Sequence, residues 1–85
     1  MTYDLIQRPT YTPGAQFSTV DVGDYNNCLL AALTYADENG YEMRPFDTKF
    51  CAALSGCAQG WGLYDEGEKV ALMGIKPVYP MEEIQ

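Results

Sequence analysis

Hydrophobic and polar residues alternate in two short segments near the N-terminus, over Tyr3–Gln7 and Gln16–Val22. This two-residue period is typical of strands that have one buried face. Pro9 follows the first segment and cannot donate to a strand ladder, so the strand should end before it. The residues between the two segments include Pro13-Gly14, a pair typical of tight turns. The pattern therefore predicts an N-terminal hairpin.

The spacing of apolar residues changes to that of a helix over Asp24–Asn39. Asp24 is a suitable N-cap, and Gly40 can adopt the left-handed conformation that ends many helices. Asp37 and Glu38 occupy the last turn, where the helix dipole disfavours anions, so we expect both to be exposed to solvent. The predicted apolar face is broad and contains Tyr25, Leu29, Ala32, Leu33 and Ala36, with Cys28, Ala31 and Tyr35 beside them.

A second helix is predicted over Asp47–Ala58. Asp47 can serve as its N-cap, and Phe46 is placed to pack against Cys51 in the first turn. The helix should end by Gly60. Its predicted apolar stripe consists of Phe50, Cys51, Leu54, Cys57 and Ala58.

The C-terminal part of the chain predicts a second hairpin. Trp61–Tyr64 and Lys69–Ile75 are strand-like and flank Asp65–Glu68, a glycine-bearing turn of suitable length. Residues 81–85 are expected to form a frayed, acidic tail. The predicted order is ββ-αα-ββ. We therefore expect a small α+β fold, a single domain over residues 1–85, in which two helices pack on an antiparallel sheet.

The charge of the 85-residue chain restricts its partners. Twelve acidic residues against five basic residues give a formal charge of −7. Direct binding to a nucleic-acid backbone requires Lys and Arg to displace counterions, so this balance excludes it. An acidic surface can instead dock onto a basic groove of a protein. The alternative is that the negative charge only keeps a small protein soluble.

The compartment is also indicated by the sequence. The longest apolar run, Cys28–Leu33, is far too short to span a bilayer. The N-terminus lacks the basic and apolar regions of a secretory signal. An odd number of cysteines in apolar surroundings (Cys28, Cys51 and Cys57) favours reduced thiols in the core. We expect a cytoplasmic protein that does not bind membranes.

No pattern of side chains indicates catalysis. The chain contains no histidine, so a Ser-His or Cys-His pair cannot form. The cysteines lack the close spacing of zinc ligands and of thiol oxidoreductases. The glycine cluster of residues 56–62 follows a predicted helix, whereas a phosphate-binding loop precedes one. We therefore predict that the protein is not an enzyme and has no catalytic residues, cofactor or metal.

The segment Leu63–Pro77, with its acidic turn and its glycine-containing apolar strand, resembles the central hairpin of GNAT-type acyltransferases. In that family, two helices precede this hairpin, as predicted here. The family's pyrophosphate-binding loop, Gln/Arg-x-x-Gly-x-Gly/Ala, does not follow. The resemblance thus implies the N-terminal half of such a fold, without acetyl-CoA chemistry.

In size, charge and lack of catalytic motifs, the chain also resembles the small phage-encoded inhibitors of bacterial defence, including anti-CRISPR proteins. This profile implies an inhibitor that occupies a basic or nucleic-acid-binding surface of a protein, as a nucleic-acid mimic. If the chain is phage-encoded, as this resemblance implies, its location is the bacterial host cytoplasm. Acidic residues would steer the encounter, and aromatic residues would anchor it. The residues expected to contact the partner are Asp37, Glu38, Tyr41, Glu42, Trp61, Tyr64, Asp65, Glu66 and Glu68.

Two other functions are compatible with the sequence. A structural or assembly subunit of a phage or larger complex would pair through exposed strand edges, for which Tyr3–Gln7 and Val70–Ile75 are the candidates. A minimal GNAT-like domain would bind acetyl-CoA. Without its partner, the chain is expected to be a monomer or a homodimer.

Overall fold

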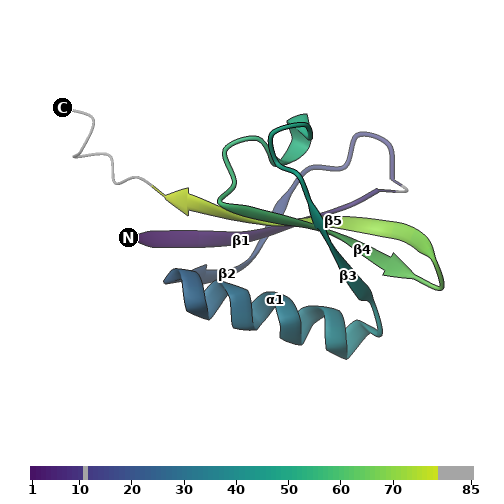
Figure 1. Ribbon diagram of the computed structural model, residues 1–85, viewed down its shortest axis with the longest axis horizontal. Helices are drawn as coiled ribbons and strands as arrows, with labels where there is room; N and C mark the ends of the chain where they lie inside the picture. Colours follow the sequence, from purple (N-terminus) through teal and green to yellow (C-terminus); the bar gives the residue numbers. More distant parts are fainter. Residues whose placement is uncertain (11, 79–85) are drawn as a thin grey trace.

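The computed structural model describes residues 1–10 and 12–78, which form a five-stranded antiparallel sheet with a helix on one face (Figure 1). The strands lie side by side in the order β2-β1-β5-β4-β3. The elements are β1 (Thr2–Pro9), β2 (Ser18–Gly23), α1 (Tyr25–Asn39), β3 (Glu42–Phe46), the 3₁₀ turn η1 (Ala52–Leu54), β4 (Gln59–Asp65) and β5 (Glu68–Val78). The predicted tail of residues 81–85 lies outside the described residues. No helix in the described ranges has the length and hydropathy needed to cross a membrane.

The centre of the sheet is formed by the first and last strands, β1 and β5. They pair antiparallel along all of β1, with Leu5 opposite Ile75. Strand β1 also forms a hairpin with β2, and β4 forms one with β5, in agreement with the two predicted hairpins. The β4–β5 turn consists of Glu66 and Gly67, whose φ angles of 51° and 86° suit the twist of a two-residue hairpin.

Helix α1 agrees closely with its predicted limits. The N–H of Asn27 donates to Oδ1 of Asp24 at 2.7 Å, and Gly40 ends the helix with φ of 69°. The prediction that Leu33 belongs to the buried face is wrong, because this side chain is 52% exposed. The residues that α1 buries are small, namely Cys28, Ala32 and Ala36. They bring the helix close to the core side chains of the sheet, which are Leu5, Trp61, Leu63, Ala71, Met73 and Ile75.

The opposite face of the sheet is covered by residues 47–58, which lie above it in Figure 1. Glycines on this face leave room for the side chains that cover it. A Cβ atom at Gly60 would lie 2.6 Å from Cδ1 of Leu54, and one at Gly62 would lie 2.7 Å from Cε2 of Phe46. A Cβ atom at Gly74 would also approach Leu54, to 3.1 Å. Leu54 is fully buried against this glycine-lined face.

The prediction of a second helix over Asp47–Ala58 is wrong, because this segment contains turns and the short η1. Oδ1 of Asp47 accepts a hydrogen bond from the N–H of Lys49, which forms a local turn instead of a helix cap. Phe50, expected on the buried stripe, is 88% exposed. The φ of 86° at Gly56 is incompatible with the interior of a right-handed helix. The chain reverses there and places η1 against the sheet.

The predicted order ββ-αα-ββ is therefore wrong, and the observed order is ββαβββ with a single α-helix in the described residues. In the sequence, Pro45 indicates a connection between the two predicted helices, whereas in the structure it lies in strand β3. Strand β3 is an edge strand that pairs only with β4, and edge strands tolerate proline. The resemblance to GNAT-type acyltransferases included two helices before the C-terminal hairpin. The structure instead has helix α1 and strand β3 before this hairpin.

Gly60→Ala should destabilise the protein, because the new methyl group would overlap the fully buried Leu54 side chain. We expect a loss of about 1–3 kcal/mol in the free energy of unfolding, measured by urea titration. Leu54→Ala alone should cost about 2–5 kcal/mol. The losses should be less than additive in the double variant, since Leu54→Ala removes the atom that the new methyl meets. Additive losses would contradict this contact.

Candidate protein-docking surface

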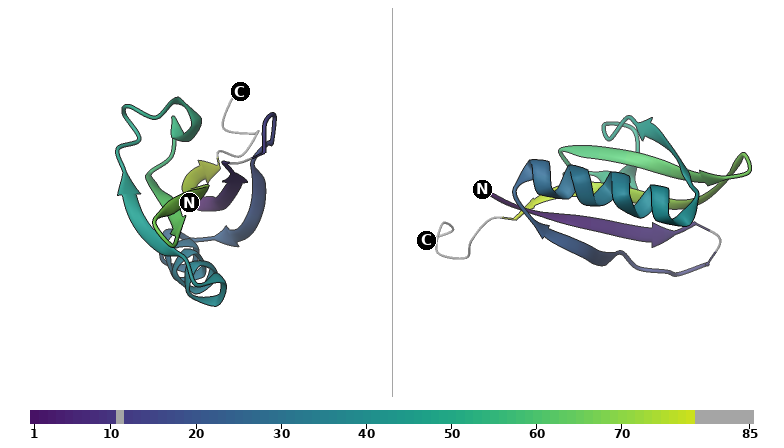
Figure 2. Two further views of the ribbon diagram at one scale, coloured as in Figure 1. Left: turned by 90° about the vertical axis from the view of Figure 1, so that its right-hand side faces the viewer. Right: turned by 90° about the horizontal axis from the view of Figure 1, so that it is seen from below.

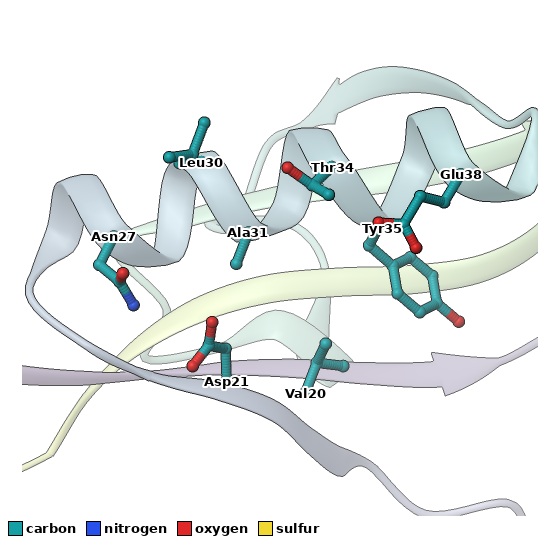
Figure 3. A pocket seen from close by; sticks show the side chains of 8 residues that line it. All are labelled: Val20, Asp21, Asn27, Leu30, Ala31, Thr34, Tyr35 and Glu38. Carbon is teal, nitrogen blue, oxygen red and sulfur yellow. The ribbon is translucent and has the colours of Figure 1, made fainter.

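A groove of about 370 Å³ lies between helix α1 and strand β2 (Figure 3). The α1 residues that line it are three or four positions apart, so they form one stripe along the helix. Its middle is largely apolar, while Asp21 and Glu38 add carboxylates to its walls. The lining residues are Val20 and Asp21 from β2, and Asn27, Leu30, Ala31, Thr34, Tyr35 and Glu38 from α1.

Two large apolar side chains of the groove are open to solvent, because Leu30 is 65% exposed and Val20 is 38% exposed. Val20 is a bulge residue: Leu5 pairs with Asp21, whereas Ile6 pairs with Thr19. Val20 therefore has no partner on β1. Exposed apolar side chains on both sides of one groove, with polar neighbours, are typical of surfaces that bind another molecule.

The outer edge of β2 is partly occupied by the protein's own side chains. The N–H of Val22 donates to Oδ1 of Asp21 at 2.8 Å, and Nδ2 of Asn27 donates to the C=O of Val22 at 3.4 Å. These bonds and the bulge at Val20 make the edge unsuitable for pairing with another strand. At the other edge of the sheet, Pro45 in β3 cannot donate. A partner would therefore contact the groove through side chains.

In the described residues, the helix side of the sheet carries acidic but no basic residues, whereas the opposite face carries both kinds. Strand β2, helix α1 and the residue between them carry Asp21, Asp24, Asp37 and Glu38, without any Lys or Arg. Three basic residues alternate with the helix-facing core positions of their strands and so lie on the opposite face: Arg8, Arg44 and Lys76. Lys69 reaches the same face because a bulge at Val70 interrupts the alternation of β5, and its Nζ lies over the Phe46 ring. The helix side is therefore uniformly acidic.

Basic residues on the opposite face have partners of their own. Cζ of Arg44 lies 4.2 Å from the ring centroid of Tyr64, and Nζ of Lys69 lies 4.4 Å from that of Phe46. Nε of Arg44 also donates to Oε2 of Glu42 at 2.6 Å, and this hydrogen bond lowers the pKa of Glu42. It is the only ion pair in residues 1–10 and 12–78. The carboxylates of the helix side are thus not neutralised by the described basic residues.

The acidic residues predicted to bind a partner all lie at one end of the molecule, where α1 ends and the β4–β5 turn projects (Figures 1 and 2). The register places Glu42 opposite Tyr64, next to this turn. All of these acidic residues are exposed: Asp37, Glu38, Glu42, Asp65, Glu66 and Glu68.

The three aromatic residues predicted as anchors are less accessible. Trp61 is 7% exposed and belongs to the core beneath α1, so it is not available to a partner. Tyr41 is half-buried against the same core. Tyr64 is half-buried and lies beside the Arg44 guanidinium. The α1–β2 groove instead contains exposed apolar side chains, namely Leu30 and Val20.

The sequence patterns missed the groove for local reasons. Leu30 lies within the apolar run Cys28–Leu33, where a buried Leu is the default expectation. The bulge at Val20 interrupts a strand whose sequence shows only alternation. One signal of the groove was present in the sequence, namely the breadth of the apolar stripe of α1. A helix that packs against a sheet through only one of its sides cannot bury so broad a stripe.

The described residues form neither a metal-binding cluster nor a site with buried polar residues. Among them, no three His, Cys, Asp or Glu side chains gather closely enough to hold a metal ion. None of their charged or polar residues is buried, whereas small-molecule sites position ligands with a few buried polar groups. The open α1–β2 groove, with its exposed carboxylates, is therefore the candidate site.

Comparison of the chain with protein-family models, with curated proteins and with solved structures finds no match. The resemblances to GNAT-type acyltransferases and to phage-encoded inhibitors therefore remain predictions. The function is inferred from the groove, the charge distribution and the fold.

The three cysteines are free thiols that differ in burial, whereas the sequence predicted all three in the core. Cys28 is fully buried beneath α1, and its Sγ donates to the C=O of Tyr3 at 3.5 Å. Burial, reinforced by Asp21, raises the pKa of this thiol. Cys51 and Cys57 are half-buried, and burial also raises the pKa of Cys57.

Labelling of the native protein with iodoacetamide, followed by mass spectrometry, should modify Cys51 first, then Cys57, and Cys28 last. Cys28 needs an opening of the structure, so we expect it to react about a thousandfold more slowly than in the urea-unfolded chain. The unfolded chain, in which all three thiols are accessible, provides the control. Rapid native labelling of Cys28 would contradict its position beneath α1.

Proposed function

We propose that this chain is a non-enzymatic protein-binding domain whose acidic helix side docks onto a basic surface of a partner protein, as an inhibitor does. The observation that carries the proposal is the position of Asp37 and Glu38 in the last turn of α1. The helix has no basic residue in its last turn and no acidic residue in its first turn. Its charges thus oppose its dipole, which lowers the stability of the helix.

The unfavourable charges at the end of α1 are not compensated by an ion pair within the described residues. A feature that weakens the fold without a structural benefit is typical of a functional surface. The exposed Leu30 in the adjacent groove has the same character. Together they suit a partner that offers cations around an apolar contact, including a basic groove that otherwise holds nucleic acid.

Assembly through strand edges, the alternative function, has little support. Tyr3–Gln7 and Val70–Ile75, the segments considered for this role, lie in β1 and β5, which have neighbours on both sides. The two edge strands carry a bulge with side-chain hydrogen bonds in β2 and a proline in β3. We therefore expect a monomer in light scattering when no partner is present.

Neutralising the acidic residues at the end of α1 should weaken partner binding without weakening the fold. The variant Asp37→Asn/Glu38→Gln is compared with Asp4→Asn/Asp47→Asn, which removes the same charge from the opposite face and its covering segment. Wild-type protein and both variants are used to capture proteins from the source cells, and the Kd of the captured partner is measured by calorimetry. We expect about tenfold weaker binding for the first variant, as for two exposed ion pairs of about 0.7 kcal/mol each.

The control variant should bind like the wild type. The unfolding midpoint of Asp37→Asn/Glu38→Gln should equal or exceed that of the wild type, because the removed charges oppose the helix dipole. Binding should also weaken as salt is raised from about 50 to about 300 mM. Equal Kd values for the two variants, or a Kd that does not depend on salt, would rule out docking through the helix side.

A further inference from the structure

We infer that the α1–β2 groove receives an amphipathic helix of the partner, in which Lys or Arg residues flank an apolar stripe. This inference rests on the proposed function and adds the kind of segment that is bound. It follows from the blocked edge of β2, the spacing of side chains along α1 and the charges around the groove.

The edge of β2 excludes an extended segment as the bound element. Strand addition needs free N–H and C=O groups, but those of Val22 are bonded to Asp21 and Asn27. The bulge at Val20 interrupts the remaining edge. The bound segment must therefore satisfy its own backbone hydrogen bonds and bind through side chains, and a helix does both.

The spacing of the groove residues matches a second helix. Along α1, Leu30, Thr34 and Glu38 repeat every four residues, a rise of about 6 Å per step. A helix that lies beside α1 presents its own side chains at the same interval. Apolar residues at positions i, i+3 or i+4, and i+7 of this helix would meet Leu30 on the α1 side of the groove and Val20 on the β2 side.

The charges identify the flanks and the direction of the bound helix. Asp21 and Glu38 lie on the walls of the groove, and Asp37 precedes Glu38 at the exposed end of α1. Basic residues on both sides of the apolar stripe would face these carboxylates. The C-terminus of α1 is negative through both its dipole and its side chains, so the positive N-terminus of the bound helix belongs there. The two helices would then run antiparallel.

A second copy of this chain does not fit the groove. It would bring its own helix side, which carries the same carboxylates and, across β2 and α1, no Lys or Arg. Like charges facing each other oppose association. The occupant is therefore a partner helix of opposite charge.

Synthetic peptides test the inference on the full chain. The probe is a peptide of about 18 residues, long enough to form a helix, built from Ala, Leu and Lys with the Leu residues in one stripe. A scrambled peptide of identical composition has the same charge but no stripe. In ¹H–¹⁵N spectra, we expect the striped peptide to shift the amide signals of α1 and β2, and to bind about tenfold more tightly than the scrambled peptide.

Leu30→Ser should weaken binding of the striped peptide about tenfold, because much of the apolar contact at one Leu side chain is lost. Val22→Ser is the matched control, since Val22 is 51% exposed, against 65% for Leu30, but lies on the other side of β2. It should leave the affinity unchanged. Equal loss in both variants would overturn the inference, as would a striped peptide that does not bind.

Equal binding of the striped and scrambled peptides would also overturn the inference of a helical partner. This outcome does not by itself contradict the proposed function. If both peptides bind equally and both are weakened by Asp37→Asn/Glu38→Gln, docking by charge survives and only the helical partner is excluded. If Asp37→Asn/Glu38→Gln changes the affinity of neither peptide, the helix side is not the docking surface.

Discussion

The antiparallel pairing of β1 with β5 is the contact on which the rest of the structure depends. It joins strands from the two ends of the described chain and thereby fuses two hairpins into one sheet. Because β1 and β5 then have neighbours on both sides, β2 lies at one edge, and β3, which pairs with β4, lies at the other. Helix α1 connects these two edges and consequently passes over one face of the sheet (Figure 2). The apolar residues on both faces of β5 fit this position, since a central strand is covered on each side.

The two faces of this sheet are covered by different means, and both rely on small residues. On one face, Cys28, Ala32 and Ala36 let α1 pack closely on the core. On the other, glycines such as Gly60 let Leu54 of the irregular segment 47–58 rest on the backbone of the sheet. A face filled in this way by single side chains does not require a second helix. The single helix then has an outer surface that nothing in the described residues covers, and Leu30 lies on it.

Helix α1 shows a conflict between local stability and the properties of its surface. Its caps are favourable, with Asp24 at the start and Gly40 at the end. Its charges are not, because the acidic residues lie at the C-terminal end. The basic residues that could have neutralised them lie on the other face, where Arg44 and Lys69 contact aromatic rings. The distribution of charge thus gives the small domain one uniformly acidic side next to an apolar groove.

The sequence by itself determined the elements whose signals are local. The caps of α1, the hairpin turn at Glu66-Gly67 and the alternation of the first two strands all depend on residues a few positions apart. The acidic residues of the candidate surface were also identifiable, since charged side chains are seldom buried. Local signals misled over residues 47–58, where an N-cap residue and apolar spacing indicate a helix, and over β3, where Pro45 indicates a break.

Only the tertiary structure decided which strands are central, which aromatic residues are buried and where the groove lies. Trp61 is in the core because β4 pairs between β5 and β3, a fact that depends on contacts distant in sequence. The α1–β2 groove depends on a bulge at Val20, which appears only when β2 is placed against β1. The position of the basic strand residues on the face opposite α1 follows from strand register, because a shift of one residue would move them to the other face. Such properties arise from long-range pairing, whose free energy is shared among many residues and is not encoded in any one segment.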